Sequence, residues 1–213
     1  MYNILITGVG GQGVVLLGNI LREHGKRAAH IKNVVGTETR GVSQREGSVL
    51  ATARYLIDSR IYSLDQNYQK EDLISPLIPT NDAHLVLGLE PLETLRNIKY
   101  ISEKSLVILN TNRLYPRNVI TGSEKQKKYP STAKIIDILD QLARRTVSMN
   151  FNELSTVKFK SAIYANTIIL GVAVQEFIEI FDTKQIISII EEILSDYEKN
   201  LEAFDLGFNL LEN

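Results

Sequence analysis

A glycine-rich hexapeptide constrains the fold of this chain more than any other feature of its sequence. Residues 8–13 read Gly-Val-Gly-Gly-Gln-Gly, after the apolar run at 4–6 and before Val-Val-Leu-Leu at 14–17. A buried strand, a turn with G-x-G-x-x-G spacing and an apolar helix form a dinucleotide fingerprint. Glycines let the backbone turn tightly near a ligand, and the N–H groups at the helix start can bind an anion. The hexapeptide therefore predicts a Rossmann-like α/β fold.

The fingerprint lacks one element that NAD-binding folds need. Such folds carry an acidic residue about 20 positions further on, at the end of the second strand, where it holds the ribose hydroxyls. We expect the second strand at 28–32, and the first acid after it is Glu38. Lys32 could meet a 2′-phosphate, although a lysine at a strand end is more commonly just solvated. A stand-alone NAD(P)-binding oxidoreductase therefore remains an alternative.

Size and composition limit the function classes. The 213 residues suit one α/β domain better than two, and the net charge of −1 does not favour nucleic acid or an acidic membrane as partner. There is no cysteine, which excludes disulfides and thiolate-held zinc or iron–sulfur clusters within this sequence. His24, His30 and His84 have no metal-ligand spacing. Because the sequence enters a strand directly and its longest apolar stretch, 167–174, is too short for a bilayer, we expect a cytoplasmic location.

Apolar runs and helical periodicity continue the α/β pattern without repeats or linkers. We expect a mostly parallel sheet with helices on both faces, further helices at the C-terminal end, and a single domain over residues 1–213. The expected strands are 3–7, 28–32, 48–57, 61–64, 83–87, 105–109 and 147–150. The expected helices are 12–24, one that begins at Glu90 with Pro91 in its first position, 133–144, 160–177 and 183–203.

The polar loop after the second expected strand is a second candidate site. Between Gly36 and Gly47 it carries charged and amide residues, among them Glu38, Arg40, Gln44, Arg45 and Glu46. Ligands bind at the carboxyl edge of doubly wound sheets, so we expect this loop to neighbour the glycine turn. The charges fit a hydrated loop with weak ion pairs equally well. They also fit a polar surface that contacts an anionic ligand or a partner subunit.

Several motifs in this chain resemble the gamma-domain family of 2-oxoacid:ferredoxin oxidoreductases. In family order, they are Gly-Val-Gly-Gly-Gln-Gly-Val-Val-Leu at 8–16, Gly-Thr-Glu-Thr-Arg-Gly-Val-Ser-Gln-Arg-Glu-Gly-Ser-Val-Leu at 36–50, Leu-Glu-Pro-Leu-Glu-Thr-Leu-Arg at 89–96, Val-Ile-Leu-Asn-Thr at 107–111, Tyr-Pro at 129–130 and Ala-Asn-Thr-Ile-Ile-Leu-Gly at 165–171. The first two motifs together are far more specific than the glycines alone. A free-standing chain of this length is most similar to beta subunits of the indolepyruvate type.

The resemblance implies a non-catalytic subunit of a larger enzyme. Such enzymes oxidatively decarboxylate a 2-oxoacid to an acyl-CoA with thiamine diphosphate, and pass electrons through iron–sulfur clusters to ferredoxin. In the indolepyruvate type these cofactors, with magnesium, belong to the alpha subunit. We therefore expect an alpha-subunit partner, ferredoxin contacted through the complex, and no catalytic residue, metal or cofactor held by this chain alone.

The expected contribution of this chain is a site shared with the partner, with CoA as a candidate ligand. The candidate binding residues are Gly8, Gly10, Gly11, Gln12, Gly13, Arg40, Gln44 and Arg45. The choice between an aryl pyruvate and another 2-oxoacid stays open. A nucleotide- or CoA-binding regulatory module stays an alternative function. An exposed apolar docking face would also allow the isolated chain to form a homodimer.

Overall fold

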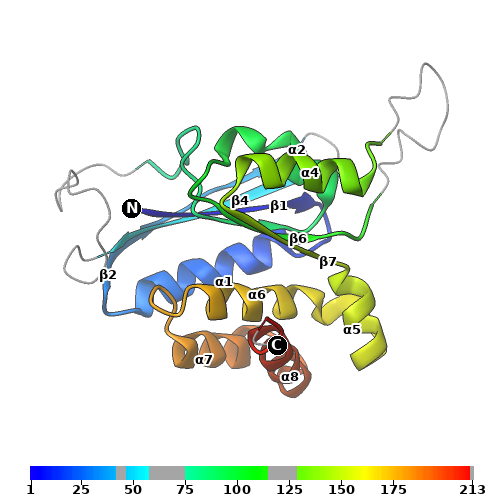
Figure 1. Ribbon diagram of the computed structural model, residues 1–213. Coiled ribbons are helices and arrows are strands. Elements are labelled where there is room, and N and C mark those ends of the chain that lie inside the picture. The colour runs from blue at the N-terminus through cyan, green and yellow to red at the C-terminus, as the bar shows by residue number, and fades with distance from the viewer. Residues whose placement is uncertain (42–46, 58–74, 115–128, 212–213) are drawn as a thin grey trace.

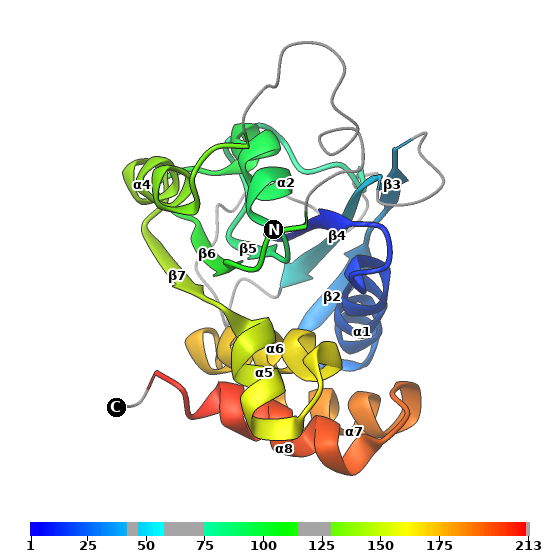
Figure 2. The same ribbon diagram turned by 90° about the vertical axis from the view of Figure 1, so that its right-hand side faces the viewer.

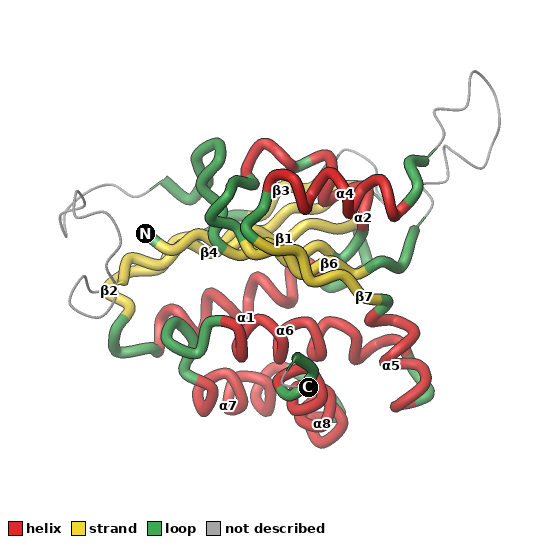
Figure 3. The backbone as a smooth tube through the Cα atoms, in the orientation of Figure 1, coloured by secondary structure: helices red, strands yellow, loops and turns green. Residues whose placement is uncertain are grey.

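The computed structural model describes residues 1–41, 47–57, 75–114 and 129–211, which form one sheet between two helical layers (Figure 1 and Figure 3). The strands are β1 Tyr2–Val9, β2 Ile31–Val35, β3 Glu38–Arg40, β4 Ser48–Ile57, β5 Leu85–Gly88, β6 Leu106–Asn110 and β7 Arg145–Met149. Their order is β2-β4-β1-β5-β6-β7, and β3 also pairs with β4. Strands β1, β5, β6 and β7 are parallel, whereas β4 is antiparallel to β1, β2 and β3. The prediction of a mostly parallel sheet is confirmed, with β4 as the strand of opposite direction.

Helices cover both faces of the sheet, as predicted. They are α1 Val14–Arg27, α2 Pro91–Arg96, α4 Thr132–Leu142, α5 Phe151–Phe159, α6 Ala165–Glu176, α7 Thr183–Ile193 and α8 Tyr197–Phe208, with short 3₁₀ turns η1 Ile98–Tyr100 and η2 Ala162–Tyr164. Helices α2 and α4 lie on one face, while α1 and α6 lie on the other with α7 and α8 outside them (Figure 1 and Figure 2). None of the helices in the described ranges has the length and apolar character needed to cross a membrane.

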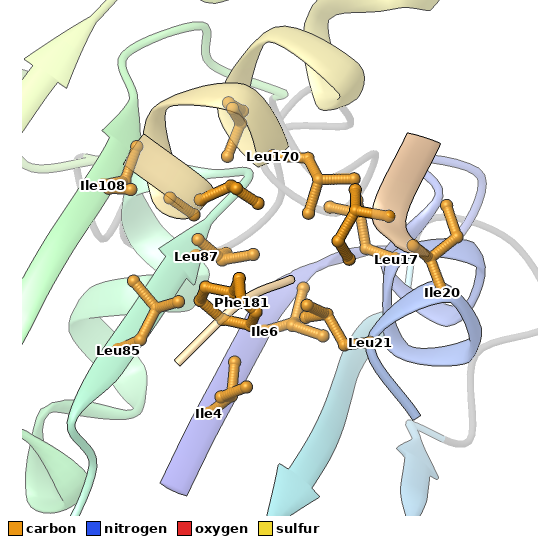
Figure 4. Close-up of a cluster of buried hydrophobic side chains, with 14 of the residues drawn as sticks. Ile4, Ile6, Leu17, Ile20, Leu21, Leu85, Leu87, Ile108, Leu170 and Phe181 are labelled. Atoms are coloured by element: carbon orange, nitrogen blue, oxygen red, sulfur yellow. The ribbon is translucent and has the colours of Figure 1, made fainter. Parts of the chain in front are cut away.

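Strand β1 runs through the middle of the core, and all eight of its residues are buried. Its side chains alternate between the faces. Ile4 and Ile6 pack in the larger cluster, which includes Leu17 of α1 and Leu170 of α6 (Figure 4). Leu5 belongs to the smaller cluster with residues of β5, β6 and α4. Burial on both faces is typical of parallel sheets covered by helices, and it explains the unbroken apolar run in the sequence.

Some expected elements are wrong in extent. The second strand begins at Ile31 rather than Ala28, because the backbone N–H of Ala28 still donates to the carbonyl of His24 and ends α1. The expected helix 160–177 begins later and is preceded by α5, since Lys160 adopts a left-handed conformation with φ of 59°. The expected helix 183–203 is likewise two helices, because Asp196 has φ of 55°.

Other expectations are confirmed. Strand β4 has the predicted bounds, 48–57, and Glu90 caps α2 with Pro91 at the first position. The expectation of a loop between Gly36 and Gly47 is wrong for residues 38–40, which form strand β3 and pair with β4. The expected strand 61–64 lies outside the described residues.

Candidate functional site

The glycine turn joins the end of β1 to the start of α1. Gly11 and Gly13 have φ of 93° and 83°, values that residues with a side chain rarely adopt. Helix α1 has no side-chain cap, and its first helical bond runs from the N–H of Leu17 to the carbonyl of Gly13. The N–H groups of the first turn therefore lack intrahelical acceptors, as the sequence motif predicts for an anion-binding loop.

Gln12 holds this turn in place. Its side-chain Oε1 accepts a hydrogen bond from the N–H of Val9 over 2.8 Å, and its Nε2 donates to the carbonyl of Leu89 over 3.1 Å. Its own backbone carbonyl accepts from Nδ2 of Asn166 over 2.6 Å. Gln12 thus connects the ends of β1 and β5 with the start of α6. The ligand role predicted for Gln12 stays a prediction, and the bracing role is what its contacts show.

The second motif lies beside the glycine turn through a direct backbone contact. The N–H of Gly10 donates to the carbonyl of Gly47 over 2.9 Å, and Val9 pairs with Ser48. The expected proximity of the two motifs is therefore found at Gly47. We expected both motifs to follow the carboxyl ends of parallel strands. Instead, the second motif precedes β4, which is antiparallel to β1 and begins beside the end of β1.

Arg40 lies two strands away from the glycine turn. It pairs with Val49, which in turn pairs with Gly8, so the strand spacing separates the backbones of Arg40 and Gly8 by roughly 10 Å. The Arg40 side chain is 69% exposed, and its contact with Glu38 is a long one of 3.5 Å. Gln44 and Arg45 lie outside the described residues. The binding roles of these three residues therefore stay predictions.

The structure also bears on the NAD(P) alternative. In the dinucleotide fold the second strand is adjacent to the first, whereas here β4 separates β2 from β1. The first acid after β2, Glu38, accepts a hydrogen bond from Arg22 of α1 over 2.6 Å. Both differences argue against a ribose-binding carboxylate at the position the fingerprint requires.

A pocket of about 360 Å³ opens beside the glycine turn. Its volume lies within the range of small-molecule sites. The lining comes from the turn, the ends of β5 and β6, and the starts of α5 and α6. The lining residues are Gly11, Gln12, Gly13, Leu16, Leu89, Asn110, Asn112, Leu114, Asn152, Ala162, Ile163, Ala165 and Asn166.

Amides and apolar side chains dominate this lining, and none of the described residues in it is charged. Three of the predicted residues, Gly11, Gln12 and Gly13, belong to it. The four asparagines were not predicted as site residues. Two signals were nevertheless present: Asn110 directly follows a buried apolar run, and Asn166 lies in the Ala-Asn-Thr motif.

Asn110 is the buried member of this group, with 2% of its surface exposed. Its Oδ1 accepts hydrogen bonds from the backbone N–H groups of Asn112 and Phe151, each over 3.2 Å. Its Nδ2 donates to Oδ1 of Asn152 over 2.6 Å. Asn110 therefore fixes both the start of α5 and the orientation of the Asn152 side chain.

A buried carboxylate lies on the other face of the sheet, at the start of α2. Glu90 is 1% exposed and accepts from the N–H of Glu93 over 2.8 Å. Tyr129 donates its hydroxyl proton to Glu90 and accepts from the N–H of Leu92 over 3.2 Å. Burial raises the pKa of Glu90, while the Tyr129 bond works in the opposite direction. Burial and the neighbouring Glu90 raise the pKa of Tyr129. Neither side chain lines the pocket, so we assign this pair to structure.

The donor set of the pocket does not fit a magnesium-bound diphosphate. Magnesium is usually held by carboxylates together with phosphate oxygens, and this pocket is lined by no Asp or Glu within the part of the chain that the structure describes. Across the described residues, no group of three or more His, Asp or Glu is placed to hold a metal ion. The pocket suits an uncharged polar group or the partial charge of an oxygen acceptor better than a metal complex.

Comparison with known proteins agrees with the motifs. Residues 3–210 match the family model described as pyruvate ferredoxin/flavodoxin oxidoreductase. The indolepyruvate oxidoreductase subunit IorB of Archaeoglobus fulgidus is 32% identical over 97% of this chain and 94% of that protein. The IorB subunit of Methanothermobacter thermautotrophicus is also 32% identical, over 97% of this chain and 96% of that protein.

Solved structures show the same fold. The gamma subunit of keto/oxoacid ferredoxin oxidoreductase from Geobacter sulfurreducens superposes with a TM-score of 0.63 at 16% identity, covering 98% of this chain and 97% of that one. The 2-oxoglutarate:ferredoxin oxidoreductase from Magnetococcus marinus gives a TM-score of 0.63 at 16% identity, covering 99% of this chain and 31% of the other. From the family match and the full-length relatives, the chain belongs to the pyruvate ferredoxin/flavodoxin oxidoreductase family.

Proposed function

We propose that this chain is the beta subunit of an indolepyruvate-type 2-oxoacid:ferredoxin oxidoreductase. The observation that carries the proposal is the match along nearly the whole chain to subunits named indolepyruvate oxidoreductase IorB. The substrate would be an aryl pyruvate, the product an acyl-CoA, and the electron acceptor ferredoxin, in the cytoplasm. A partner alpha subunit would hold thiamine diphosphate, magnesium and the iron–sulfur clusters, because this sequence has no cysteine for the clusters.

The pocket beside the glycine turn supports a binding role rather than a chemical one. The described residues of its lining include no Ser, Cys, His, Lys, Tyr, Asp or Glu, so they offer no usual nucleophile or general acid or base. It does offer amides, an uncapped helix start and exposed apolar side chains at Leu16, Leu114 and Ile163. We infer that the partner covers this apolar rim and that substrate or CoA lies between the subunits.

The experiment is co-expression with a candidate alpha subunit, followed by an assay of 2-oxoacid-dependent reduction of ferredoxin or a dye. The panel should contain indolepyruvate, phenylpyruvate, pyruvate and 2-oxoglutarate. We expect CoA-dependent activity only when both chains are present, highest with an aryl pyruvate. Full activity of the alpha subunit alone would contradict the proposal. Binding of CoA by this chain with no turnover in any pairing would favour the regulatory module instead.

A further inference from the structure

The asparagines of the pocket form a relay whose polarity is fixed by the backbone. An asparagine amide has an oxygen that accepts and a nitrogen that donates hydrogen bonds. The Oδ1 of Asn110 accepts from two backbone N–H groups, those of Asn112 and Phe151. A backbone N–H cannot accept, so only the oxygen of Asn110 satisfies both. The nitrogen of Asn110 must therefore point towards Asn152.

This arrangement determines which end of Asn152 is available to a ligand. Nδ2 of Asn110 donates to Oδ1 of Asn152 over 2.6 Å, which occupies the oxygen end. The Nδ2 of Asn152 has no hydrogen-bond partner within the part of the chain that the structure describes. Asn152 lines the pocket and is half-buried. The relay thus leaves two N–H donors of Asn152 for a group that enters the pocket.

The surroundings indicate what kind of acceptor would suit those donors. Asn152 is in the first turn of α5, and the uncapped start of α1 lines the same pocket, so both helix dipoles favour an oxygen acceptor. Among the described residues that line the pocket, none carries a charge that would neutralise a formal charge on the ligand. Apolar side chains, among them Leu89, Leu114 and Ile163, line the pocket together with the amides. This combination suits an extended uncharged chain that carries amide carbonyls.

We propose that Asn152 contacts the ligand by donating to an amide carbonyl of the pantetheine arm of CoA, and that Asn110 is the positioning residue that sets this polarity. The inference rests on the proposed function, which brings CoA to the shared site. It goes further by placing the neutral arm, rather than the phosphates, in the pocket and by naming the donor. The predicted loop residues Gly11 and Gly13 line the same pocket.

Two isosteric substitutions test the polarity. Asn152→Asp keeps an oxygen that accepts from Asn110 but removes both donors. Asn110→Asp keeps the acceptor for the backbone N–H groups but cannot donate, so Asn152 has to turn its oxygen to the pocket. The matched control is Asn150→Asp, which adds the same charge at the start of α5 outside the pocket lining and retains a good N-cap.

The variants should be assayed in the complex with the alpha subunit. We expect the KM for CoA to rise about tenfold in both Asn152→Asp and Asn110→Asp, which corresponds to the loss of one hydrogen bond, with kcat and the KM for the 2-oxoacid unchanged. Asn150→Asp should behave as the wild type. A KM for CoA in Asn152→Asp equal to that of Asn150→Asp would overturn the inference, as would a rise confined to the 2-oxoacid. If the aspartate variant of residue 152 does not assemble, Asn152→Ala gives the same comparison.

Competition separates the two ends of CoA. Pantetheine and adenosine 3′,5′-bisphosphate should be tested as competitors of desulfo-CoA binding to the complex, measured by calorimetry and therefore independent of turnover. In Asn152→Asp we expect weaker competition by pantetheine and unchanged competition by the bisphosphate. The reverse result would overturn the assignment of the neutral arm. If the wild-type complex shows no 2-oxoacid-dependent turnover, the proposed function fails. The role of Asn152 is still tested, because the binding of desulfo-CoA is measured without turnover.

Discussion

The side-chain nitrogen of Asn166 donates a hydrogen bond to the backbone carbonyl of Gln12 over 2.6 Å, which joins residues 154 positions apart. This bond fastens the glycine turn to the start of α6. A turn that contains two glycines with positive φ is otherwise costly to order, because glycine loses more conformational freedom on folding than other residues. The C-terminal helices therefore determine how rigidly the turn is presented to a ligand or partner.

Asn166→Ala should loosen the turn and reduce the stability of the fold. It removes a hydrogen bond from a half-buried amide, and we expect the free energy of unfolding to fall by about 1–2 kcal/mol. Urea unfolding of the isolated chain measures this change. The control is Asn209→Ala, because Asn209 is exposed and its side-chain amide donates within its own helix end, to the carbonyl of Asp205. Equal losses in the two variants would contradict the anchoring role.

Gly13 should tolerate a side chain less well than Gly11. Both residues have positive φ, but a Cβ on Gly13 would lie 2.5 Å from Nδ2 of Asn166, while a Cβ on Gly11 would meet nothing within 4 Å. We expect Gly11→Ala to cost about 1 kcal/mol from backbone strain alone, and Gly13→Ala to cost clearly more. In an Asn166→Ala background the excess cost of Gly13→Ala should shrink. An unchanged excess in this double-mutant cycle would show that the overlap with Asn166 is not its cause.

Acid should destabilise the fold through two buried histidines. Burial lowers the pKa of His24 and of His84 from 6.5 to about 4. Nε2 of His24 accepts a hydrogen bond from the backbone N–H of Asp182, and Nδ1 of His84 accepts one from the N–H of Asn3. Only an unprotonated ring nitrogen can accept, so both bonds require the neutral ring. Between pH 6.5 and 4 the unfolded chain binds more protons than the folded one. The stabilisation is therefore complete above pH 6.5 and is lost as the pH falls towards 4.

Urea unfolding at pH 7.5, 6 and 5 checks this dependence. We expect a loss of about 1 kcal/mol per pH unit for each histidine between pH 6 and 5. Glu90 acts in the opposite sense. Its pKa is raised in the folded state, so the folded chain binds this proton more tightly than the unfolded chain, and this contribution to stability grows as the pH falls. Replacing His84 with Asn should reduce the slope by removing one titrating group. A stability that stays constant from pH 7 to 5 would contradict the role of both histidines.

The sequence predicts the elements whose signals are local. The glycine turn, the bounds of β4 and the Glu90 cap with Pro91 all follow from short patterns. Helix α5 also had a local signal, since Asn150 caps it and exchanges hydrogen bonds with Glu153, an N-terminal pattern that could have located it. What could not be predicted depends on long-range pairing. The position of β4 between β1 and β2 depends on which strands pair, and the asparagine pocket forms only when segments far apart in the sequence meet.

Tyr129→Phe should destabilise the region around α2. The hydroxyl of Tyr129 donates to the buried Glu90 and accepts from the N–H of Leu92, so its removal leaves both groups without that partner. We expect a loss of about 1–3 kcal/mol in the free energy of unfolding. Tyr197→Phe is the control, because Tyr197 is 47% exposed, and its cost should stay within about 0.5 kcal/mol. Similar losses in the free energy of unfolding for the two variants would contradict a stabilising role for the hydrogen bond between Tyr129 and Glu90.

Arg40→Ala should separate function from folding. The side chain is 69% exposed, and its 3.5 Å contact with Glu38 is too weak to stabilise the chain measurably, so the free energy of unfolding should change by less than about 0.5 kcal/mol. Its position two strands from the glycine turn places its charge near the proposed shared site. We expect the 2-oxoacid-dependent activity of the complex to fall roughly tenfold, because loss of a charged contact at an interface slows association or weakens binding.

The matched control for Arg40 is Arg145→Ala. Arg145 is also exposed and pairs with one carboxylate, Glu176. It lies at the start of β7, at the edge of the sheet opposite to the one where β1 ends in the glycine turn. Assembly with the alpha subunit should be measured beside activity, by size-exclusion chromatography of the purified complex. Reduced assembly would place Arg40 at the subunit contact, whereas normal assembly with a raised KM would place it at the ligand. Activity equal to that of Arg145→Ala would remove Arg40 from the shared site, and with it the functional interpretation of the described part of the second motif.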